Sequence, residues 1–490
     1  MAGAISGLDA ARARHLLSRF AFGPRPGEVE ALREQGLGAW LDQQLDPDGI
    51  PDSEADQRLE PYTSSLSPDQ QLRAFRALRK RGTPNPDMDV PELSRRDFRD
   101  LAARAQLLEL GRFVESKRQL REVMTDFWSS HFNIYARKGP VRFLTADYVE
   151  HTLRPHALGK FEDLLLATAK HPAMLIYLDN AKSFKPARPG TPAAKRKKGL
   201  NENYARELLE LHTLGVDGGY TQQDVIEVAR VLTGWSVSRP GEGALEFKFR
   251  QRQHDTGAKT VLGQEFPAGG DEAEGERLIR LLARQPATAR HLARKLCARF
   301  VSDDPPEACV NSASRTYMET GGDLARVIRS IASGPSFWAP EVRGTKIKSP
   351  LELVVSAVRA ADGHLDGGVG LGRTLADLGQ PLFLYAAPTG YPERGDAWMG
   401  PGQALSRMRF GIQFAAGRVR GISYEPDRVL PLAEHADQAT ANVNRVFFAG
   451  TLGPESVAEL EEELKGLPNP RQLRAHAVAF AVGGPEFQRQ

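Results

Sequence analysis

The segment from Leu200 to Trp235 holds the densest group of chemically active side chains in the protein. It contains six carboxylates, two arginines, two asparagines and one histidine. At about 100° per residue of an α-helix, Arg206, Glu207 and Glu210 lie on one stripe. His212 falls within the adjoining apolar face, where an imidazole needs a polar partner. The two glutamates repel each other unless a proton, a cation or an arginine lies between them, so the segment predicts either a site or a polar network between helices.

Two interpretations of this helix stay open. In an enzyme, Glu207 or Glu210 acts as general base or metal ligand, and Arg206 orients an anionic group of the substrate. In a purely structural protein, the same side chains form a buried salt-bridge network centred on Arg206. The sequence does not choose between the two.

Histidines elsewhere in the chain extend the enzyme hypothesis. His131 lies in WSSHFN, and His254 and Asp255 are adjacent in QRQHDTGA. With His212 they form a candidate set of ligands for a divalent transition metal, in a metal-dependent hydrolase or oxidoreductase. Each also has a structural interpretation, as a packed core histidine or as a turn-forming aspartate. Haem stays open, because a single axial histidine leaves no spacing signature.

Other polar residues and the two cysteines are expected to be structural. In the helix that follows the metal candidates, Arg294 and Lys295 are interpreted as surface or structural charges. Cys297 and Cys309 are the two cysteines of the chain, which excludes a framework of several disulfides. Cys297 sits in an apolar helical pattern and is interpreted as a small core residue.

The elements that must position these residues are mostly helices. A 3.6-residue hydrophobic period recurs along the chain, and strand-like alternation is confined to EFKFR and KTVLG. The pattern predicts a mainly α protein, one large helical domain over residues 1–490 with long ordered loops. A small β-hairpin is predicted within 245–263, with His254 and Asp255 near its tip. Thr221 and Asp224 predict a capping box at the start of a helix.

Residues 182–199 form a segment of different composition. They contain seven Lys or Arg, three Pro, two Gly and no acid. Such a segment buries little apolar surface, so a mobile basic surface loop is predicted. It is interpreted either as a solvated insertion or as a lid that attracts an anionic substrate.

Composition excludes several classes of protein. The net charge of +3, from 65 basic and 62 acidic residues, offers no general field for nucleic acid. No apolar run reaches the roughly 18 residues that a membrane span needs, and the N-terminus lacks the apolar core of a signal peptide. A cytoplasmic protein is therefore expected. The zincin, Walker, Rossmann and nucleophile-elbow motifs are all absent from the sequence.

Several blocks of the sequence resemble a bacterial family of unknown function. They include RHLLSRFAFGPRPGEVEAL, DFWSSHFNI, NENYARELLELHTLGVDGGYTQQDVIEVARVLTGW, HDTGAKTVLG and PTGYPERGDAWMG. The family is domain of unknown function 1800, and the resemblance runs from about Leu8 to Phe487, outside the basic insertion. It implies one family-length unit and no particular activity.

The resemblance also suggests a partner. Proteins of this family resemble partners of the domain of unknown function 1501 family, which looks sulfatase-like and is often exported. A non-catalytic assembly or maturation partner is therefore the alternative to an enzyme, and export with that partner is the alternative to the cytoplasm.

Overall fold

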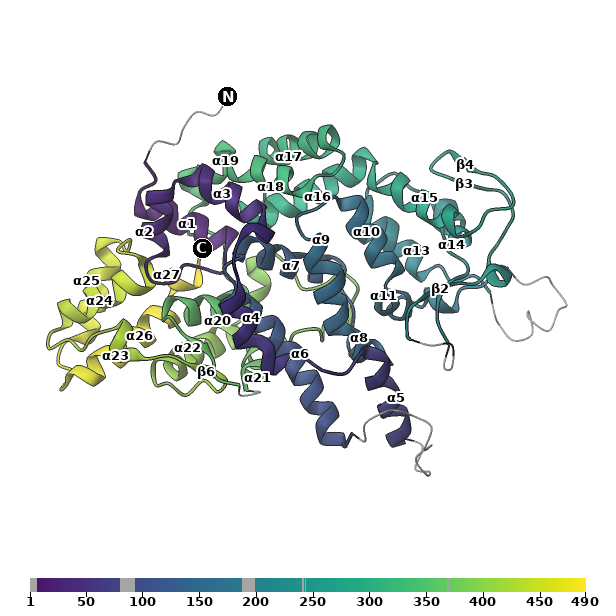
Figure 1. The fold of residues 1–490 in the computed structure, drawn as a ribbon. Helices are drawn as coiled ribbons and strands as arrows, with labels where there is room; N and C mark the ends of the chain where they lie inside the picture. The colour runs from purple at the N-terminus through teal and green to yellow at the C-terminus, as the bar shows by residue number, and fades with distance from the viewer. Residues whose placement is uncertain (1–6, 80–92, 187–198, 240–241, 243, 368–369) are drawn as a thin grey trace.

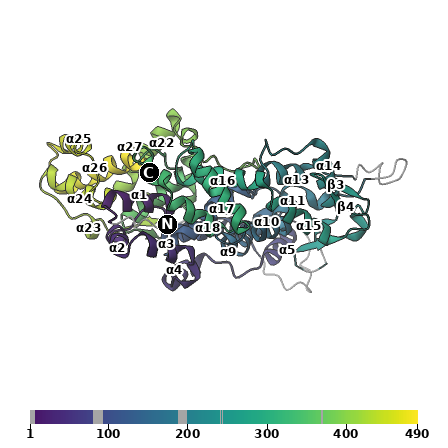
Figure 2. The same ribbon diagram turned by 90° about the horizontal axis from the view of Figure 1, so that it is seen from above.

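The structure is a computed structural model that describes residues 7–79, 93–186, 199–239, 242, 244–367 and 370–490. The protein is 63 % helical and mainly α, as predicted. Helices are stacked along an elongated body, with α25 and β4 near its opposite ends (Figures 1 and 2). One continuous hydrophobic core runs through it.

The helices of the first half range from 3 to 21 residues in length. They are α1 (Ala10–Phe20), α2 (Glu28–Gln35), α3 (Leu37–Leu45), α4 (Ser53–Leu59), α5 (Pro68–Arg79), α6 (Arg95–Glu115), α7 (Gln119–His131), α8 (Val141–Tyr148), α9 (Arg154–His156), α10 (Phe161–Lys170), α11 (Pro172–Tyr177), α13 (Asn203–Glu207) and α14 (Gln222–Val231). Two π-helical turns, η3 (Val149–Leu153) and η5 (Leu208–Thr213), extend α8 and α13. Asp9 caps α1, and the predicted capping box of Thr221 and Asp224 starts α14.

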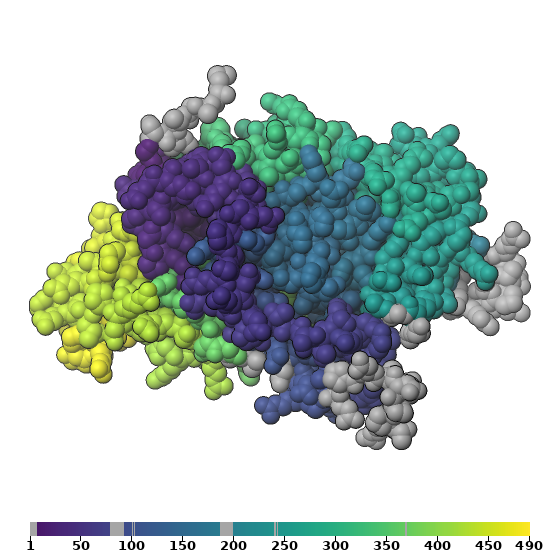
Figure 3. Space-filling model, in the orientation of Figure 1, coloured from purple at the N-terminus to yellow at the C-terminus, as the bar shows by residue number. Residues whose placement is uncertain are grey.

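The second half continues the helical stacking. Its helices are α15 (Glu272–Ala283), α16 (Pro286–Phe300), α17 (Glu307–Thr320), α18 (Leu324–Ala332), α19 (Pro335–Trp338), α20 (Pro350–Ala360), α21 (Gly370–Asp377), α22 (Pro401–Ala415), α23 (Pro426–Val429), α24 (Ala436–Phe448), α25 (Pro454–Leu464), α26 (Pro470–Gly483) and α27 (Pro485–Gln488). The chain ends against its beginning, because Arg19 of α1 donates a 2.7 Å hydrogen bond to the carbonyl of Gln490. Figure 3 shows these N-terminal and C-terminal parts side by side at one end of the molecule.

The predicted hairpin within 245–263 is wrong in its pairing. The strands are β1 (Trp235–Val237), β2 (Phe247–Phe249), β3 (Lys259–Val261), β4 (Gln264–Phe266), β5 (His364–Leu365) and β6 (Ile422–Ser423), and they pair antiparallel as β1–β2, β3–β4 and β5–β6. The reason is the turn at Leu262 and Gly263, whose φ angles of 49° and 75° suit a two-residue turn with the twist of a hairpin. KTVLG therefore folds back on the residues that follow it and not on EFKFR.

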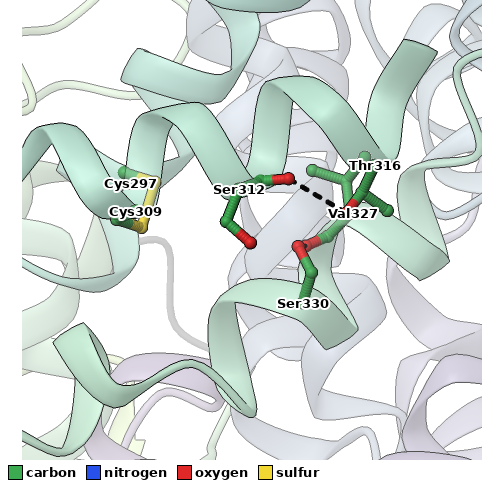
Figure 4. Close-up of a disulfide and its surroundings, with 6 residues drawn as sticks. All are labelled: Cys297, Cys309, Ser312, Thr316, Val327 and Ser330. Carbon is green, nitrogen blue, oxygen red and sulfur yellow. Dashed lines mark hydrogen bonds between the residues drawn. A yellow bond between two sulfur atoms is a disulfide. The ribbon is translucent and has the colours of Figure 1, made fainter. Parts of the chain in front are cut away.

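The interpretation of Cys297 as a simple core residue needs correction. Cys297 of α16 is buried, but it forms a disulfide with Cys309 of α17 (Figure 4). The bridge joins two helices that are adjacent in sequence and packed together. A framework of several bridges is still excluded, because the chain has no further cysteine.

Two other expectations concern the surface of the molecule. The predicted mobile loop at 182–199 falls mostly on residues 187–198, outside the described residues, so its mobility stays a prediction. In the part of the chain that the structure describes, no helix is long and apolar enough to cross a membrane.

Candidate functional site

Three histidines and one lysine meet where α7, η5 and α16 come together. His131 ends α7, His212 lies in η5, and His291 and Lys295 are one turn apart on α16. The His131 ring centroid is 6.1 Å from that of His212 and 6.2 Å from that of His291. We call these four residues the Lys295 cluster.

The protonation state of His131 follows from its two contacts. Its Nε2 is 3.2 Å from the carbonyl oxygen of His212, which can only accept, so Nε2 carries the proton and donates. Its Nδ1 is 2.9 Å from the Lys295 Nζ and therefore accepts a hydrogen bond from the amine. Burial, followed by the charge of Lys295, holds the pKa of His131 well below its usual value. His131 is thus a neutral imidazole with its lone pair on the lysine.

His212 is the least satisfied member of the cluster. It is 1 % exposed, and its Nε2 is buried without a hydrogen-bond partner. Burial lowers its pKa to about 3, with Lys295 adding to the effect, so it too is neutral. An unpaired buried nitrogen costs free energy unless something fills the space beside it, which makes His212 a candidate ligand contact.

His291 has a clear structural role. Its Nε2 donates to the carbonyl oxygen of Leu211 at 3.2 Å, as His131 does to that of His212. The two imidazoles thereby satisfy carbonyls at the end of η5, where intrahelical partners run out. The left-handed Gly215 makes room, since a Cβ there would lie 2.8 Å from the His291 Nδ1.

Lys295 was interpreted from the sequence as a surface or structural charge, and its surroundings differ from those of an exposed lysine. Its side chain is half-buried, and the hydrogen bond to His131 is made with an imidazole rather than with a carboxylate. Burial lowers the pKa of Lys295 to about 8, partly offset by the charge of Glu393. An amine with this pKa is unprotonated in about a tenth of the molecules at pH 7 and in about half of them at pH 8.

A small cavity is lined by residues of α7 and α16 that lie near the cluster in sequence. Asp126 and Ser130 line it from α7, Arg299 lines it from α16, and Glu393 lines it from the loop before α22. Burial raises the pKa of Asp126 to about 7, although Arg299 opposes the shift from 3.4 Å. A carboxyl group that stays partly protonated thus lies on α7, five residues before His131.

The loop that brings Glu393 here depends on a glycine. Gly390 has a φ of 69°, and a Cβ at this position would lie 2.0 Å from the carbonyl oxygen of Ser130. The loop is pinned further by the Asn133 side-chain amide, which donates to the carbonyls of Tyr385 and Ala387. Only a glycine allows this approach to the end of α7.

The glutamates predicted as catalytic lie at the edge of this region. Glu207 and Glu210 are half-buried, and burial, followed by the charge of Glu210, raises the pKa of Glu207. Arg206 does not lie between them, since its side chain is 41 % exposed and bonds Glu202 and Gln222. The buried network centred on Arg206 is therefore absent, because the arginine points along the surface.

His254 and Asp255 belong to a different part of the molecule. The His254 Nδ1 donates to the carbonyl of Thr233 at 2.8 Å, and its Nε2 lies 3.1 Å from Glu274, which also binds Lys259. Asp255 accepts from Arg230 at 2.8 Å and from the backbone of the turn that follows. We call His254, Lys259 and Glu274 the Glu274 cluster.

The expected convergence of His131, His212, His254 and Asp255 on one metal is thus not observed. Among the described residues, no group of three or more His, Cys, Asp or Glu could hold a metal ion. The physical reason is that every polar atom of His254 and Asp255 faces α14 and α15 instead of α7.

Comparison with known proteins gives a family and nothing more specific. The model of a family described as "protein of unknown function (DUF1800)" matches residues 15–489. The chain belongs to this family. No curated protein and no solved structure matches it.

For this DUF1800 protein the match confirms the near full-length resemblance, and it leaves the chemistry to the site itself. Burial shifts the pKa values of three groups here: it lowers those of Lys295 and His131 and raises that of Asp126. The sequence signal for Lys295 was weak. His291 and Lys295 are four residues apart on one helix face, but nothing in the sequence pairs them with His131.

Proposed function

We propose that the protein is an enzyme in which Lys295 is the catalytic amine. The observation that carries the proposal is the hydrogen bond from the Lys295 Nζ to His131, with no carboxylate in its place. Catalytic lysines are desolvated in this way, because a neutral amine is a base and a nucleophile whereas an ammonium group is neither. His131 would hold the amine in place, and His212 would meet the substrate with its unpaired nitrogen.

Asp126, which lines the small cavity, supports the same chemistry. A carboxyl group with its pKa raised to about 7 can give a proton while a neutral amine takes one. The proposed reaction class is therefore proton transfer, or attack by the amine, at a carbonyl compound or an ester. Glu207, whose pKa is also raised, remains a candidate general base at the edge of the site.

The reactivity of the amine can be measured without a known substrate. Pulses of acetic anhydride over a pH series, followed by peptide mass spectrometry, give the midpoint at which each lysine becomes acylated. We expect a midpoint near pH 8 for Lys295, and the exposed Lys248 serves as the reference lysine. Equal midpoints would contradict the proposal.

A screen of ester and carbonyl probes tests catalysis directly. Turnover should be lost in Lys295→Met and retained in Lys248→Met, with circular dichroism showing that both variants are folded. Turnover that survives in Lys295→Met would assign the activity elsewhere.

The metal-dependent version of the enzyme stays a separate proposal. His131 and His212 are the two predicted ligands that lie together, and a divalent transition metal or haem would need further ligands beside them. Elemental analysis and an absorption spectrum of the purified protein test this. A stoichiometric metal or a haem band that His212→Ala removes would support it, and a metal-free active protein would contradict it.

The second candidate is an assembly or maturation partner of a sulfatase-like protein of the 1501 family. The exposed aliphatic residues on α22 favour a binding role, because a soluble monomer rarely gathers such residues on one face. Co-expression of the two proteins and co-purification through a tag on one of them tests the pairing. Separate elution at micromolar concentration would contradict it.

We also propose that the protein works in an oxidising compartment and not in the cytoplasm. The disulfide between Cys297 and Cys309 supports this, since such bonds persist in exported proteins and are reduced in most cytosols. Labelling with iodoacetamide, without reduction, in separated cell fractions tests it. Alkylation of Cys297 and Cys309 in the unreduced protein would show that they are free thiols, which would support a cytoplasmic location instead.

A further inference from the structure

Helix α22 carries an aliphatic stripe on its exposed side. Leu405, Met408 and Ile412 are 59 %, 56 % and 61 % exposed, and their spacing of three and four residues places them on one side of the helix. Met399, just before the helix, is 42 % exposed. Half of the eight large apolar residues that are exposed in the described parts of the chain thus lie within 399–412.

The stripe is not required by the core of the protein. The opposite side of α22 buries Phe410 and Phe414 and crosses α26 closely at Gly411. A Cβ on Gly411 would lie 2.8 Å from the Gly483 backbone nitrogen, so the two helices are nearly in backbone contact. In both ribbon views α22 and α26 lie together in the C-terminal part of the molecule (Figures 1 and 2). The stripe is therefore held rigidly and faces outward.

A groove runs beside the stripe, between α21 and α22. Thr374 and Asp377 line it from α21, and Arg409 and Gln413 line it from α22. The stripe and the groove are adjacent faces of the same helix, because Arg409 follows Met408 directly. Together they form a ridge with a hollow next to it, which is a shape that a helix can dock on.

The charge of this surface limits what can cover it. Residues 401–424 contain four arginines and no acid, and Arg409, Arg418 and Arg420 are exposed. A second copy of the chain that docked stripe to stripe would bring these like charges together. An acidic partner would instead be attracted to them.

We infer that α22 is a docking surface for an acidic amphipathic helix of a partner protein. Leucine-type side chains of the partner would cover Leu405, Met408 and Ile412, and its carboxylates would face Arg409 and the two arginines after the helix. A flat anionic membrane fits less well, because the groove is concave and Asp377 forms part of its wall. The inference deepens the second candidate function and does not depend on the chemistry of Lys295.

The test is selection from a displayed library of random 16-residue peptides on the full-length protein. Peptides that also bind Met408→Glu are removed by counter-selection. Enriched sequences should carry Leu, Ile or Met at positions i, i+3 and i+7, with Asp or Glu between them. An enriched peptide should bind the wild type with micromolar affinity by fluorescence anisotropy, at least tenfold more tightly than it binds Ile412→Glu.

A matched control separates this surface from any exposed apolar residue. Met318→Glu alters a methionine that is 44 % exposed on α17, and it should leave peptide affinity unchanged. Binding should also weaken as salt rises from 50 to 200 mM. Basic enriched sequences, or no enrichment after counter-selection, would overturn the inference.

Two further measurements test the two other possible occupants of the α22 surface, a second copy of the chain and a lipid membrane. A concentration-dependent dimer in light scattering that Met408→Glu abolishes would assign the surface to a second copy. Binding to phosphatidylglycerol vesicles that the same variant abolishes would assign it to a lipid surface. Either result would overturn the partner helix, and neither would alter the labelling of Lys295, so the two proposals fail separately.

Discussion

The Lys295 cluster and the Glu274 cluster both place a lysine next to a histidine, but only the second contains a carboxylate. Each places a lysine and a histidine in the interior, between helices of the same body. In the Glu274 cluster both oxygens of Glu274 bind Lys259, at 2.9 and 2.8 Å, and His254 lies 3.1 Å away. In the Lys295 cluster an imidazole nitrogen takes the place of the carboxylate.

That difference separates a structural lysine from a reactive one. A carboxylate at hydrogen-bond distance keeps a buried amine charged and ties two elements together, here β3 and α15. A neutral imidazole stabilises the charge much less, so desolvation dominates and the pKa of Lys295 falls to about 8. The first arrangement joins two elements of the fold, and we propose that the second leaves an amine available for chemistry.

Lys348 shows that a missing carboxylate alone does not make a site. Its Nζ donates to the hydroxyl of Ser356 and lies 3.8 Å from the centre of the Phe487 ring. Burial holds its pKa well below the usual value, as for Lys295. However, Lys348 is 3 % exposed and its amine donates to a serine hydroxyl, whereas Lys295 is half-buried and its amine bonds the imidazole of His131.

The largest expected effect is on the Glu274 cluster. Glu274→Gln leaves the fully buried Lys259 without its carboxylate and should lower the free energy of unfolding by about 3–5 kcal/mol. Chemical denaturation followed by circular dichroism measures the loss. Glu265→Gln, at an exposed position on β4, is the control and should stay within about 0.5 kcal/mol. A loss below about 1 kcal/mol for Glu274→Gln would break the comparison.

The next effect is a loss of stability in acid that originates in the Lys295 cluster. The pKa of His212 is about 3 in the folded protein and 6.5 when unfolded, so below pH 6.5 the unfolded chain binds more protons. Stability should therefore fall as pH falls, by up to about 1.4 kcal/mol per unit from this group. Denaturation between pH 6.5 and 5.5 should show a shallower fall in His212→Phe. The same slope in this variant and in the wild type would contradict the prediction, and the exposed His435→Phe serves as control.

Replacing each lysine by methionine should give a smaller effect, which distinguishes Lys295 from Lys259. Lys295→Met should change stability at pH 7 by less than about 1 kcal/mol, because it removes a charge that the fold does not pair. Lys259→Met should cost several times more, since it strands a buried carboxylate. The folded pKa of Lys295 lies below its unfolded value, so the wild type should gain stability relative to Lys295→Met from pH 8 to 10.5. Equal losses for the two variants in denaturation at pH 7 would remove the distinction.

The smallest expected effect concerns Glu393, whose negative charge acts on Lys295. Glu393 raises the pKa of this amine, so Glu393→Gln should lower the pH midpoint of its acylation by less than one unit. Peptide mass spectrometry after pulsed acylation gives the shift. Glu210→Gln is the matched control and should leave the midpoint unchanged. A rise in the midpoint would show that Glu393 acts through the position of the loop and not through its charge.

Local sequence rules predicted the parts of this fold that local rules govern. The helical period and the capping box of Thr221 and Asp224 both depend on residues within one turn of each other. Strand pairing depended on the turn at Leu262 and Gly263. Both residues have positive φ angles, and a leucine gives no sequence signal for that conformation. The pairing was therefore predicted wrongly while the class was right.

The candidate site was predicted in part for the same reason. His131 and His212 were chosen for their residue type, and the structure does bring their rings within 6.1 Å. His254 was chosen on the same grounds, and it lies instead against Glu274. The residue type limits the contacts that a side chain can make, and its neighbours in the fold determine which of them it makes.

The sequence by itself determined the helical class, the family and the supply of ionisable side chains. Only the tertiary structure decided that Lys295 meets His131, 164 positions away, and that Lys259 meets Glu274. The physical reason is that desolvation and pairing set the charge of a buried group, and both are properties of the space around it. The same residue type therefore pairs with a carboxylate at Lys259 and with an imidazole at Lys295.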